Sequence, residues 1–142
     1  MINSRDIKDL HPKVQVIANK FIDACEKAGI DILITSTYRD FESQNDLYAQ
    51  GRTKPGAKVT NAKGGESWHN YKLAFDIVPL RNGKPVWNTT GEDLKLWQKV
   101  GKIGKDVGLE WAGDWKTMKE MAHFQYSGGL TLKDLQSGKM LK

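Results

Sequence analysis

Cysteine is almost missing from this 142-residue chain, and the shortage limits the kinds of protein it can be. The single cysteine, Cys25, has no partner within the chain, so an intramolecular disulfide is excluded. A zinc site built on several cysteine ligands is excluded for the same reason. Cys25 lies on the apolar side of a helical pattern, which predicts a buried thiol. Any metal ligands must therefore be sought among other side chains.

Long apolar runs are also missing. No stretch approaches the roughly 18 consecutive apolar residues that a membrane-spanning helix needs. Residues 1–6 (MINSRD) do not form the apolar segment of a secretory signal peptide. We therefore expect no stable insertion into a membrane, and we expect synthesis and folding in the cytoplasm. Anything outside the cell would have to be reached by another route.

Positive charge is in excess without being concentrated anywhere. The 22 Lys and Arg residues outnumber the 17 Asp and Glu residues, which gives a formal net charge of +5. A basic surface favours polyanions, such as nucleic acid or an anionic cell wall. The chain has no block of five or more like charges and no nucleic-acid motif, so we expect no nucleic acid partner.

Hydrophobic periodicity and turn residues predict that helices and strands share one domain spanning residues 1–142. We expect helices over residues 11–27, 40–50, 90–107 and 131–138, and strands over residues 31–35, 73–80, 84–87, 109–112 and 122–126. Residues 53–65 and 67–71 are expected to be loops. Asn82-Gly83 predicts a hairpin turn, Thr90 a helix cap and Pro79 the stop of a strand. The pattern indicates an α+β fold, with helices packed around a small antiparallel sheet.

Two histidines and an aspartate form the most informative combination in the chain. His69 and Asp76 are expected on a loop and on the strand that follows it, and His123 on a later strand, so they can converge. Two neutral imidazoles and one carboxylate are a ligand set that zinc accepts, with a fourth position left open for water. Glu120, three residues before His123, can serve as the base that such a water needs. The remaining histidine, His11, is interpreted as structural.

The spacing Ser67-x-His69-x6-Asp76, followed by Glu120-x-x-His123, resembles the signature of the D-alanyl-D-alanine carboxypeptidase superfamily of zinc peptidases. That superfamily includes the vancomycin-resistance D,D-peptidases and is related to the zinc-bearing domain of hedgehog proteins. The chain is most similar to one branch, the L-alanyl-D-glutamate endopeptidases found as phage endolysins and bacterial wall hydrolases. Phrases of that branch occur in order at residues 36–39 (STYR), 44–53 (QNDLYAQGRT), 59–62 (VTNA), 113–115 (GDW) and 123–125 (HFQ).

The resemblance implies a hedgehog/D,D-peptidase-like zinc peptidase fold in which His69, Asp76 and His123 hold one zinc ion. It implies that Glu120 is the catalytic base and that Arg39 stabilises negative charge in the transition state. The implied substrate is peptidoglycan, cut at the L-Ala–D-Glu bond of its stem peptides. The residues expected to contact the substrate or to shape its groove are Ser67, Gln44, Asp114 and Trp115.

The resemblance also implies a phage or prophage lysis enzyme. We expect a monomer that accumulates in the host cytoplasm, has no separate wall-binding domain and reaches the wall through a holin-type pore. Two other hypotheses stay open. One is a D-Ala-D-Ala carboxypeptidase on the same scaffold, and the other is a non-catalytic wall-binding domain that keeps zinc for structure.

Three positions depart from the family pattern. Lys72 stands where the family usually has glycine, and a glycine there suggests a tight or left-handed turn. Lysine could strain that turn or move the segment that carries His69. Ala122 replaces a proline that is common in the branch, and Glu120 replaces an aspartate of many relatives. Every ligand type is retained, so the departures concern fine geometry more than metal binding.

Overall fold

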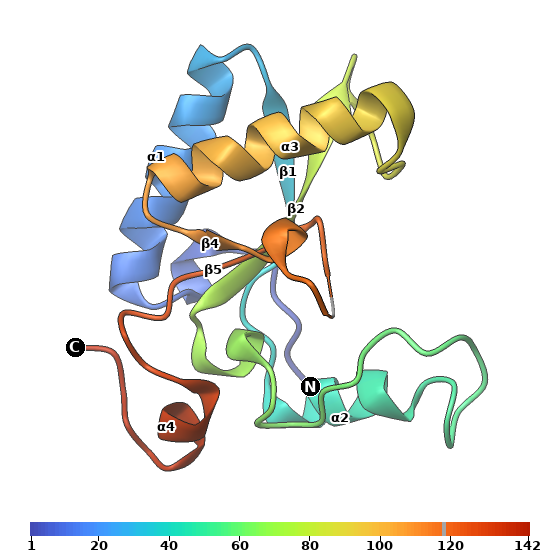
Figure 1. Cartoon of the computed structure of the whole chain (residues 1–142). Helices are drawn as coiled ribbons and strands as arrows, with labels where there is room; N and C mark the ends of the chain where they lie inside the picture. The colour runs from blue at the N-terminus through green and yellow to red at the C-terminus, as the bar shows by residue number, and fades with distance from the viewer. Residues whose placement is uncertain (118) are drawn as a thin grey trace.

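A short-stranded antiparallel sheet organises the chain (Figure 1). The structure is a computed structural model, and it describes residues 1–117 and 119–142. Within these residues the strands are β1 (Asp31–Ser36), β2 (Ala74–Arg81), β3 (Lys84–Pro85), β4 (Glu110–Trp111) and β5 (His123–Gln125). They follow the order β1-β2-β5-β4, and β3 pairs with the end of β2 as a hairpin. Asn82 and Gly83 both have positive φ at this turn, which is what the predicted hairpin requires.

Helices pack around this sheet. Among the described residues they are α1 (Pro12–Lys27), α2 (Phe41–Ala49), α3 (Gly91–Asp106) and α4 (Leu132–Gln136), with short 3-10 helices η1 (Ile7–Asp9), η2 (Trp68–Tyr71) and η3 (Ala112–Asp114). α1 and α3 contact each other and the sheet, whereas α2 and the loop after it project away as an arm, residues 41–65 (Figure 1). None of the described helices has the length and apolar character needed to cross a membrane. The arrangement confirms the predicted α+β class.

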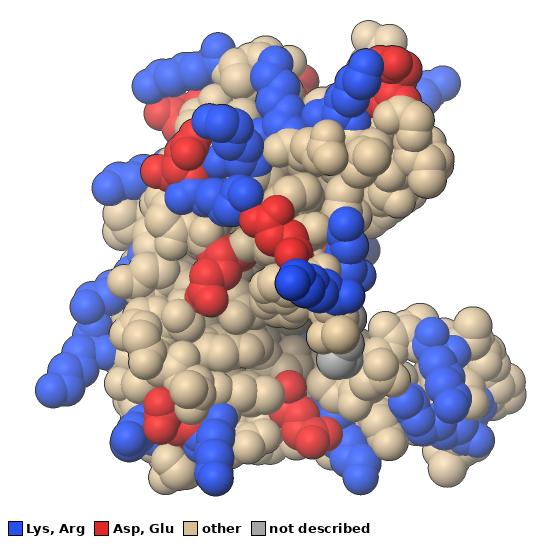
Figure 2. Space-filling model, in the orientation of Figure 1, with Lys and Arg blue, Asp and Glu red and all other residues tan. Residues whose placement is uncertain are grey.

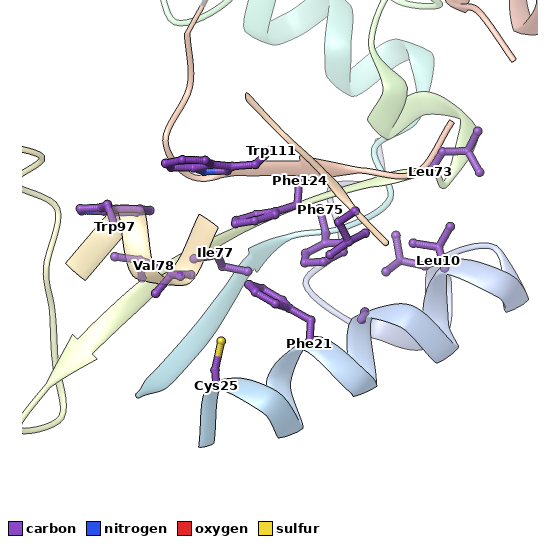
Figure 3. Close-up of a cluster of buried hydrophobic side chains, with 14 of the residues drawn as sticks. Leu10, Phe21, Cys25, Leu73, Phe75, Ile77, Val78, Trp97, Trp111 and Phe124 are labelled. Atoms are coloured by element: carbon purple, nitrogen blue, oxygen red, sulfur yellow. The ribbon is translucent and has the colours of Figure 1, made fainter. Parts of the chain in front are cut away.

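The core lies between the sheet and the helices α1 and α3 (Figure 3). The ring centroid of Phe21 on α1 lies 6.0 Å from that of Phe75 on β2 and 4.8 Å from that of Phe124 on β5. All three rings are fully buried, and burial of each contributes about 1.5–3 kcal/mol relative to exposure. Cys25 belongs to the same buried cluster, as predicted, and burial raises the pKa of its thiol to about 11.

Two glycines let α3 approach the sheet closely. A Cβ atom on Gly101 would lie 2.4 Å from the Trp111 ring, and one on Gly104 would lie 2.4 Å from the Phe124 ring. Both distances are well inside van der Waals contact, so even alanine would force a ring or the helix to move. The glycines lower the intrinsic helix propensity of residues 91–106, and packing of the helix against the aromatic rings offsets that loss of stability.

The alternation of side chains along β2 separates the core from the candidate site. Phe75 and Ile77 point into the core, so Asp76 between them faces the other side of the sheet. Across the antiparallel pair of β2 and β5, Phe75 lies opposite Phe124 and Asp76 lies opposite His123. A single register therefore places an aromatic pair in the core and a pair of candidate ligands on the opposite face.

Two expectations about the ends of strands and helices are wrong. Pro79 does not stop β2, which continues to Arg81, because the Pro79 carbonyl still accepts a hydrogen bond from the Val86 N–H at 2.9 Å. Thr90 occupies the N-cap position of α3 but makes no capping hydrogen bond, because its hydroxyl donates to Oδ1 of Asn88 at 3.1 Å. The other helices and strands lie where the sequence predicts them, with shifted ends.

Candidate metal centre

Three candidate ligands meet on the face of the sheet opposite the core. His69 comes from η2, Asp76 from β2 and His123 from β5. Nε2 of His69 lies 3.2 Å from Oδ1 of Asp76, and Nδ1 of His123 lies 3.3 Å from the same oxygen. The three ligand atoms lie within 4.8 Å of one another, and both imidazoles are buried. The fold thus brings together the three residues expected to hold a metal.

The outer nitrogen of each imidazole is held by an oxygen atom. Nδ1 of His69 lies 2.8 Å from the carbonyl oxygen of Thr37, and Nε2 of His123 lies 2.8 Å from Oε1 of Gln125. These nitrogens must donate, because a carbonyl oxygen can only accept. In neutral imidazoles, Nε2 of His69 and Nδ1 of His123 therefore carry lone pairs that face Asp76. Ligating histidines are commonly fixed in tautomer and orientation in this way.

This donor set fits a bound cation. When both imidazoles are neutral, two lone pairs and a carboxylate converge and repel one another unless a positive charge lies among them. Ligands about 2.0–2.2 Å from a tetrahedral zinc ion stand roughly 3.3–3.6 Å apart. The two distances of 3.2 and 3.3 Å to Oδ1 of Asp76 are close to that spacing. Three protein ligands would leave a fourth position open, which is the pattern of catalytic zinc sites.

The charges of the three groups are linked. Burial alone raises the pKa of Asp76, but the charges and hydrogen bonds of His69 and His123 hold it well below its usual range. Burial alone lowers the pKa of His123, but its hydrogen bond with Asp76 and the charge of Asp76 raise it above its ordinary value. Both shifts mean that positive charge is favoured next to the Asp76 carboxylate.

The 3-10 helix η2 positions His69. The expected loop over residues 67–71 is replaced by this helix, because Ser67 and Asn70 form a capping box at its start. The Asn70 side-chain amide also donates to the Arg39 carbonyl at 2.8 Å, which ties η2 to the segment after β1. The hydroxyl of Ser67 accepts from the His69 N–H at 3.3 Å, so Ser67 supports the backbone of a candidate ligand.

Lys72 ends η2 in the left-handed conformation, with a φ of 65°. The glycine usual in the family thus corresponds to a backbone conformation that glycine adopts without strain. The Lys72 amino group lies 5.0 Å from the centre of the Tyr38 ring, a cation–π contact that offsets part of the strain. The Lys72 carbonyl accepts from the His11 N–H at 3.0 Å, so η2 remains joined to the start of α1.

Replacing Lys72 with glycine should stabilise the protein. A left-handed conformation costs an L-residue about 1–2 kcal/mol, so we expect the free energy of unfolding to rise by about 0.5–1 kcal/mol after loss of the cation–π contact. Urea unfolding measures the difference. Lys72→Ala is the matched control, because it removes the same amino group but keeps Cβ, and it should be no more stable than the wild type. Equal stability of the two variants would show that the strain lies elsewhere.

Arg39 follows β1 and lies close enough to Asp76 and Glu120 for their negative charges to act on its guanidinium. Its Nη1 donates to Oε1 of Gln44 at 2.8 Å, and its Nη2 donates to Oγ of Ser36 at 3.1 Å. Burial lowers the pKa of Arg39, and the negative charges of Asp76 and Glu120 oppose that shift. Since both hydrogen-bond acceptors are neutral, the guanidinium charge stays available to a group that enters the site.

Glu120 and Trp115 border the ligands, whereas Asp114 turns away. Oε2 of Glu120 lies 3.9 Å from Nδ1 of His123, and the Glu120 side chain is 58% exposed, so water and substrate can reach it. The ring centroid of Trp115 lies 5.7 Å from that of His123. Asp114 forms an ion pair with Lys105 of α3 at 2.7 Å. Of Asp114 and Trp115, the structure places only Trp115 beside the candidate ligands.

Two residues that orient the candidate ligands were given no role of their own in the sequence analysis. Gln125 stands two residues after His123 on a strand and so shares its face, a spacing that could have identified it. Thr37 acts through its backbone carbonyl, which no side-chain pattern reveals. Gln44, expected to contact the substrate or shape its groove, is fully buried and contacts Arg39.

An α+β scaffold that gathers two imidazoles and a carboxylate, with an exposed glutamate and a half-buried arginine beside them, has the parts of a metal-dependent hydrolase. The sequence matches the VanY family, described as D-alanyl-D-alanine carboxypeptidase, over residues 7–129. The chain belongs to this family of peptidases, and the match confirms the family expected from the sequence motifs.

Two relatives support this assignment. The chain is 43% identical over 124 residues to the peptidoglycan L-alanyl-D-glutamate endopeptidase CwlK of Bacillus subtilis (strain 168), an alignment that covers 82% of this chain and 73% of CwlK. It is 31% identical over 123 residues to the L-alanyl-D-glutamate peptidase of Listeria phage A118, which covers 86% of this chain and 40% of the phage protein. The chain thus spans most of the bacterial enzyme but less than half of the phage enzyme.

Solved structures agree on the fold. The L-Ala D-Glu endopeptidase ChiX of Serratia marcescens superposes with a TM-score of 0.64 at 19% identity, covering 95% of this chain and 92% of ChiX. A mutant of the vancomycin resistance D,D-pentapeptidase VanY, in complex with Zn(II), superposes with a TM-score of 0.61 at 14% identity, covering 99% of this chain and 86% of VanY. These likenesses confirm the D,D-peptidase-like fold expected from the sequence.

Proposed function

We propose that this chain is a zinc-dependent peptidoglycan endopeptidase that hydrolyses the L-Ala–D-Glu bond of murein stem peptides. The observation that carries the proposal is the cluster of His69, Asp76 and His123 with Glu120 beside it, in a chain 43% identical to a peptidase named for that bond. We also propose that residues 1–142 form one catalytic domain.

The metal-binding part of the site would consist of His69, Asp76 and His123, with Thr37 and Gln125 holding the two imidazoles in orientation. A zinc ion supplies Lewis-acid chemistry, because it polarises a peptide carbonyl and lowers the pKa of water toward 7. Buried donors of fixed tautomer need little rearrangement to accept the ion.

The remaining residues of the site handle protons and charge. Glu120 takes a proton from the attacking water and passes it to the amine of the leaving residue. Negative charge develops on the carbonyl oxygen, and Arg39 supplies the compensating positive charge. Because Gln44 and Ser36 already hold the guanidinium, that charge is in place before the reaction begins. We propose that Trp115 forms a wall of the groove next to His123 and that Ser67 keeps His69 in position. Asp114 holds the segment that contains it and Trp115 against α3.

Digestion of purified murein tests the function. The proposal predicts muropeptides cut between L-Ala and D-Glu, loss of that activity with a chelator and its recovery with added zinc, all read by mass spectrometry. Release of terminal D-Ala with the L-Ala–D-Glu bond intact would instead identify a D,D-carboxypeptidase. Protein that binds zinc and sediments with murein without cutting it would be a wall-binding domain.

Arg39→Ala should retain zinc and lose turnover. The guanidinium acts as charge develops, so kcat should fall by about a hundred- to a thousandfold while KM changes little. Arg81→Ala is the charge-matched control, because Arg81 is exposed and pairs with Asp93 at the far end of β2. Zinc content and steady-state kinetics of both variants decide the point. A loss confined to KM would assign Arg39 to substrate binding in the ground state.

We further propose a role in host lysis, supported by the similarity to a phage peptidase. The protein would accumulate as a monomer in the host cytoplasm and reach the wall through a holin-type pore. Expression without a pore-forming partner should leave cells intact, whereas co-expression with one should lyse them. Prompt lysis by the protein alone would contradict this route, and sedimentation of the purified protein would test its monomeric state.

A further inference from the structure

A hollow of about 200 Å³ opens beside Glu120, whose carboxylate lies 3.9 Å from the candidate ligand His123. It separates two segments that are far apart in the sequence, the arm at residues 58–61 and the segment at residues 119–120. Its lining consists of Lys58, Val59, Thr60, Asn61, Lys119 and Glu120. Figure 2 shows Lys and Arg side chains gathered over the arm and over the part of the body that faces it. The hollow is therefore a basic surface that reaches the proposed catalytic base.

The arm side of this hollow has a fixed shape although it lacks regular secondary structure. Nη1 of Arg52 donates to the carbonyls of Tyr48 and Thr60 at 2.6 and 3.1 Å, and its guanidinium stacks 3.8 Å from the centre of the Tyr48 ring. Nε2 of the buried Gln44 donates to the Ala62 carbonyl at 2.7 Å. These bonds tie the loop to α2, so the residues between them are presented to the hollow in a defined position.

The two lysines of the hollow have no acidic partner among the described residues. Lys58 and Lys119 are both exposed, and neither forms an ion pair within 4.0 Å with any described residue. Lys54 of the same arm, by contrast, pairs with Asp46. Glu120 is the sole acidic residue in the lining. Two uncompensated ammonium groups on facing walls favour an anion between them.

We propose that Lys58 and Lys119 form a carboxylate subsite for the residue on the leaving side of the scissile bond. The inference rests on the proposed function and extends it to substrate selection. Glu120 hands its proton to the leaving amine, so the leaving residue must lie against Glu120, where the hollow begins. A glutamate that continues a peptide through one carboxyl group keeps the other free. That free carboxylate is the anion that the two ammonium groups bind.

A pair of synthetic stem peptides tests the subsite. They differ in one group, with the free carboxylate of D-glutamate present in the first and converted to the carboxamide in the second. The wild type should prefer the carboxylate, and the preference should appear in KM. In the double variant Lys58→Ala/Lys119→Ala, the ratio of the two kcat/KM values should fall about tenfold toward one. Lys119→Arg, which keeps the charge, should retain most of the preference.

The control is Lys20→Ala/Lys99→Ala, which removes two exposed lysines of α1 and α3 and the same net charge. It should keep the wild-type ratio, and zinc content should be equal in all variants. A wild type that cleaves both peptides equally well, or a double variant that keeps the preference, overturns the subsite and leaves the proposed function standing. A zinc-loaded wild type that cleaves neither peptide overturns the proposed function itself.

Discussion

His123→Ala is expected to abolish zinc binding and activity together. His123 supplies one of three proposed ligands, and with two left the site has neither the donors nor the geometry to retain the ion. We expect zinc content to fall to background and the rate of murein cleavage to fall by more than about a thousandfold, or about 4 kcal/mol of transition-state stabilisation. Metal analysis of the purified variant and a cleavage assay on the same sample measure both quantities. Asp76→Ala should behave in the same way.

Gln125→Ala is the control for this result, because it should weaken zinc binding without abolishing it. Gln125 lies on the same face of β5 and accepts from Nε2 of His123 at 2.8 Å, but it is not itself a proposed ligand. We expect zinc affinity about ten- to a hundredfold weaker, with activity restored by excess zinc. The His123 variant should show no such recovery. Full zinc content in His123→Ala would remove His123 from the ligand set.

Glu120→Ala is expected to separate catalysis from metal binding. The carboxylate lies 3.9 Å from His123 and is largely exposed, which suits a group that exchanges protons with water and substrate. Zinc content should remain at the wild-type level, while kcat falls by about a hundred- to ten-thousandfold, the usual effect of losing a positioned general base. Glu120→Gln should be equally inactive, because the amide keeps the shape but cannot take a proton.

Glu26→Ala provides the charge-matched control, since Glu26 is exposed on α1, which packs on the core side of the sheet. It should keep both zinc and rate. The decisive comparison is zinc content beside relative rate for the Glu120 and His123 variants. If Glu120→Ala lost its zinc while His123→Ala kept it, the roles assigned to the two residues would be reversed and the mechanism would be wrong.

The sequence predicts the parts of this protein that depend on residue type and periodicity. The apolar stripe of α1, the alternation around Asp76 and the Asn82-Gly83 turn each specify local structure through side-chain chemistry, and the structure agrees with them. The candidate ligand set could also be predicted, because the spacing of His69, Asp76 and His123 resembles the signature of a zinc peptidase family. The pairing of β2 with β5 then brings Asp76 and His123 together, and η2 adds His69.

Features that depend on competition between partners were harder to predict. Thr90 has the side chain of a helix cap, but Asn88 is close enough to bind its hydroxyl instead. Asp114 was expected near the substrate, yet Lys105 on the neighbouring helix attracts its carboxylate. The carbonyl of Thr37 is placed by the chain path after β1 rather than by a side chain. Such outcomes require the tertiary arrangement, which a local pattern does not contain.

The register that sets Asp76 opposite His123 and Phe75 opposite Phe124 has a consequence for how this chain can diverge. Inserting or deleting one residue within β2 or β5 would exchange the two faces, sending a carboxylate or an imidazole into the core and an aromatic ring toward solvent. Changes of length are therefore tolerable only outside these strands. The arm lies outside these strands, and because it forms one wall of the hollow beside Glu120, changes in the length of its loop would alter which substrates the proposed subsite accepts.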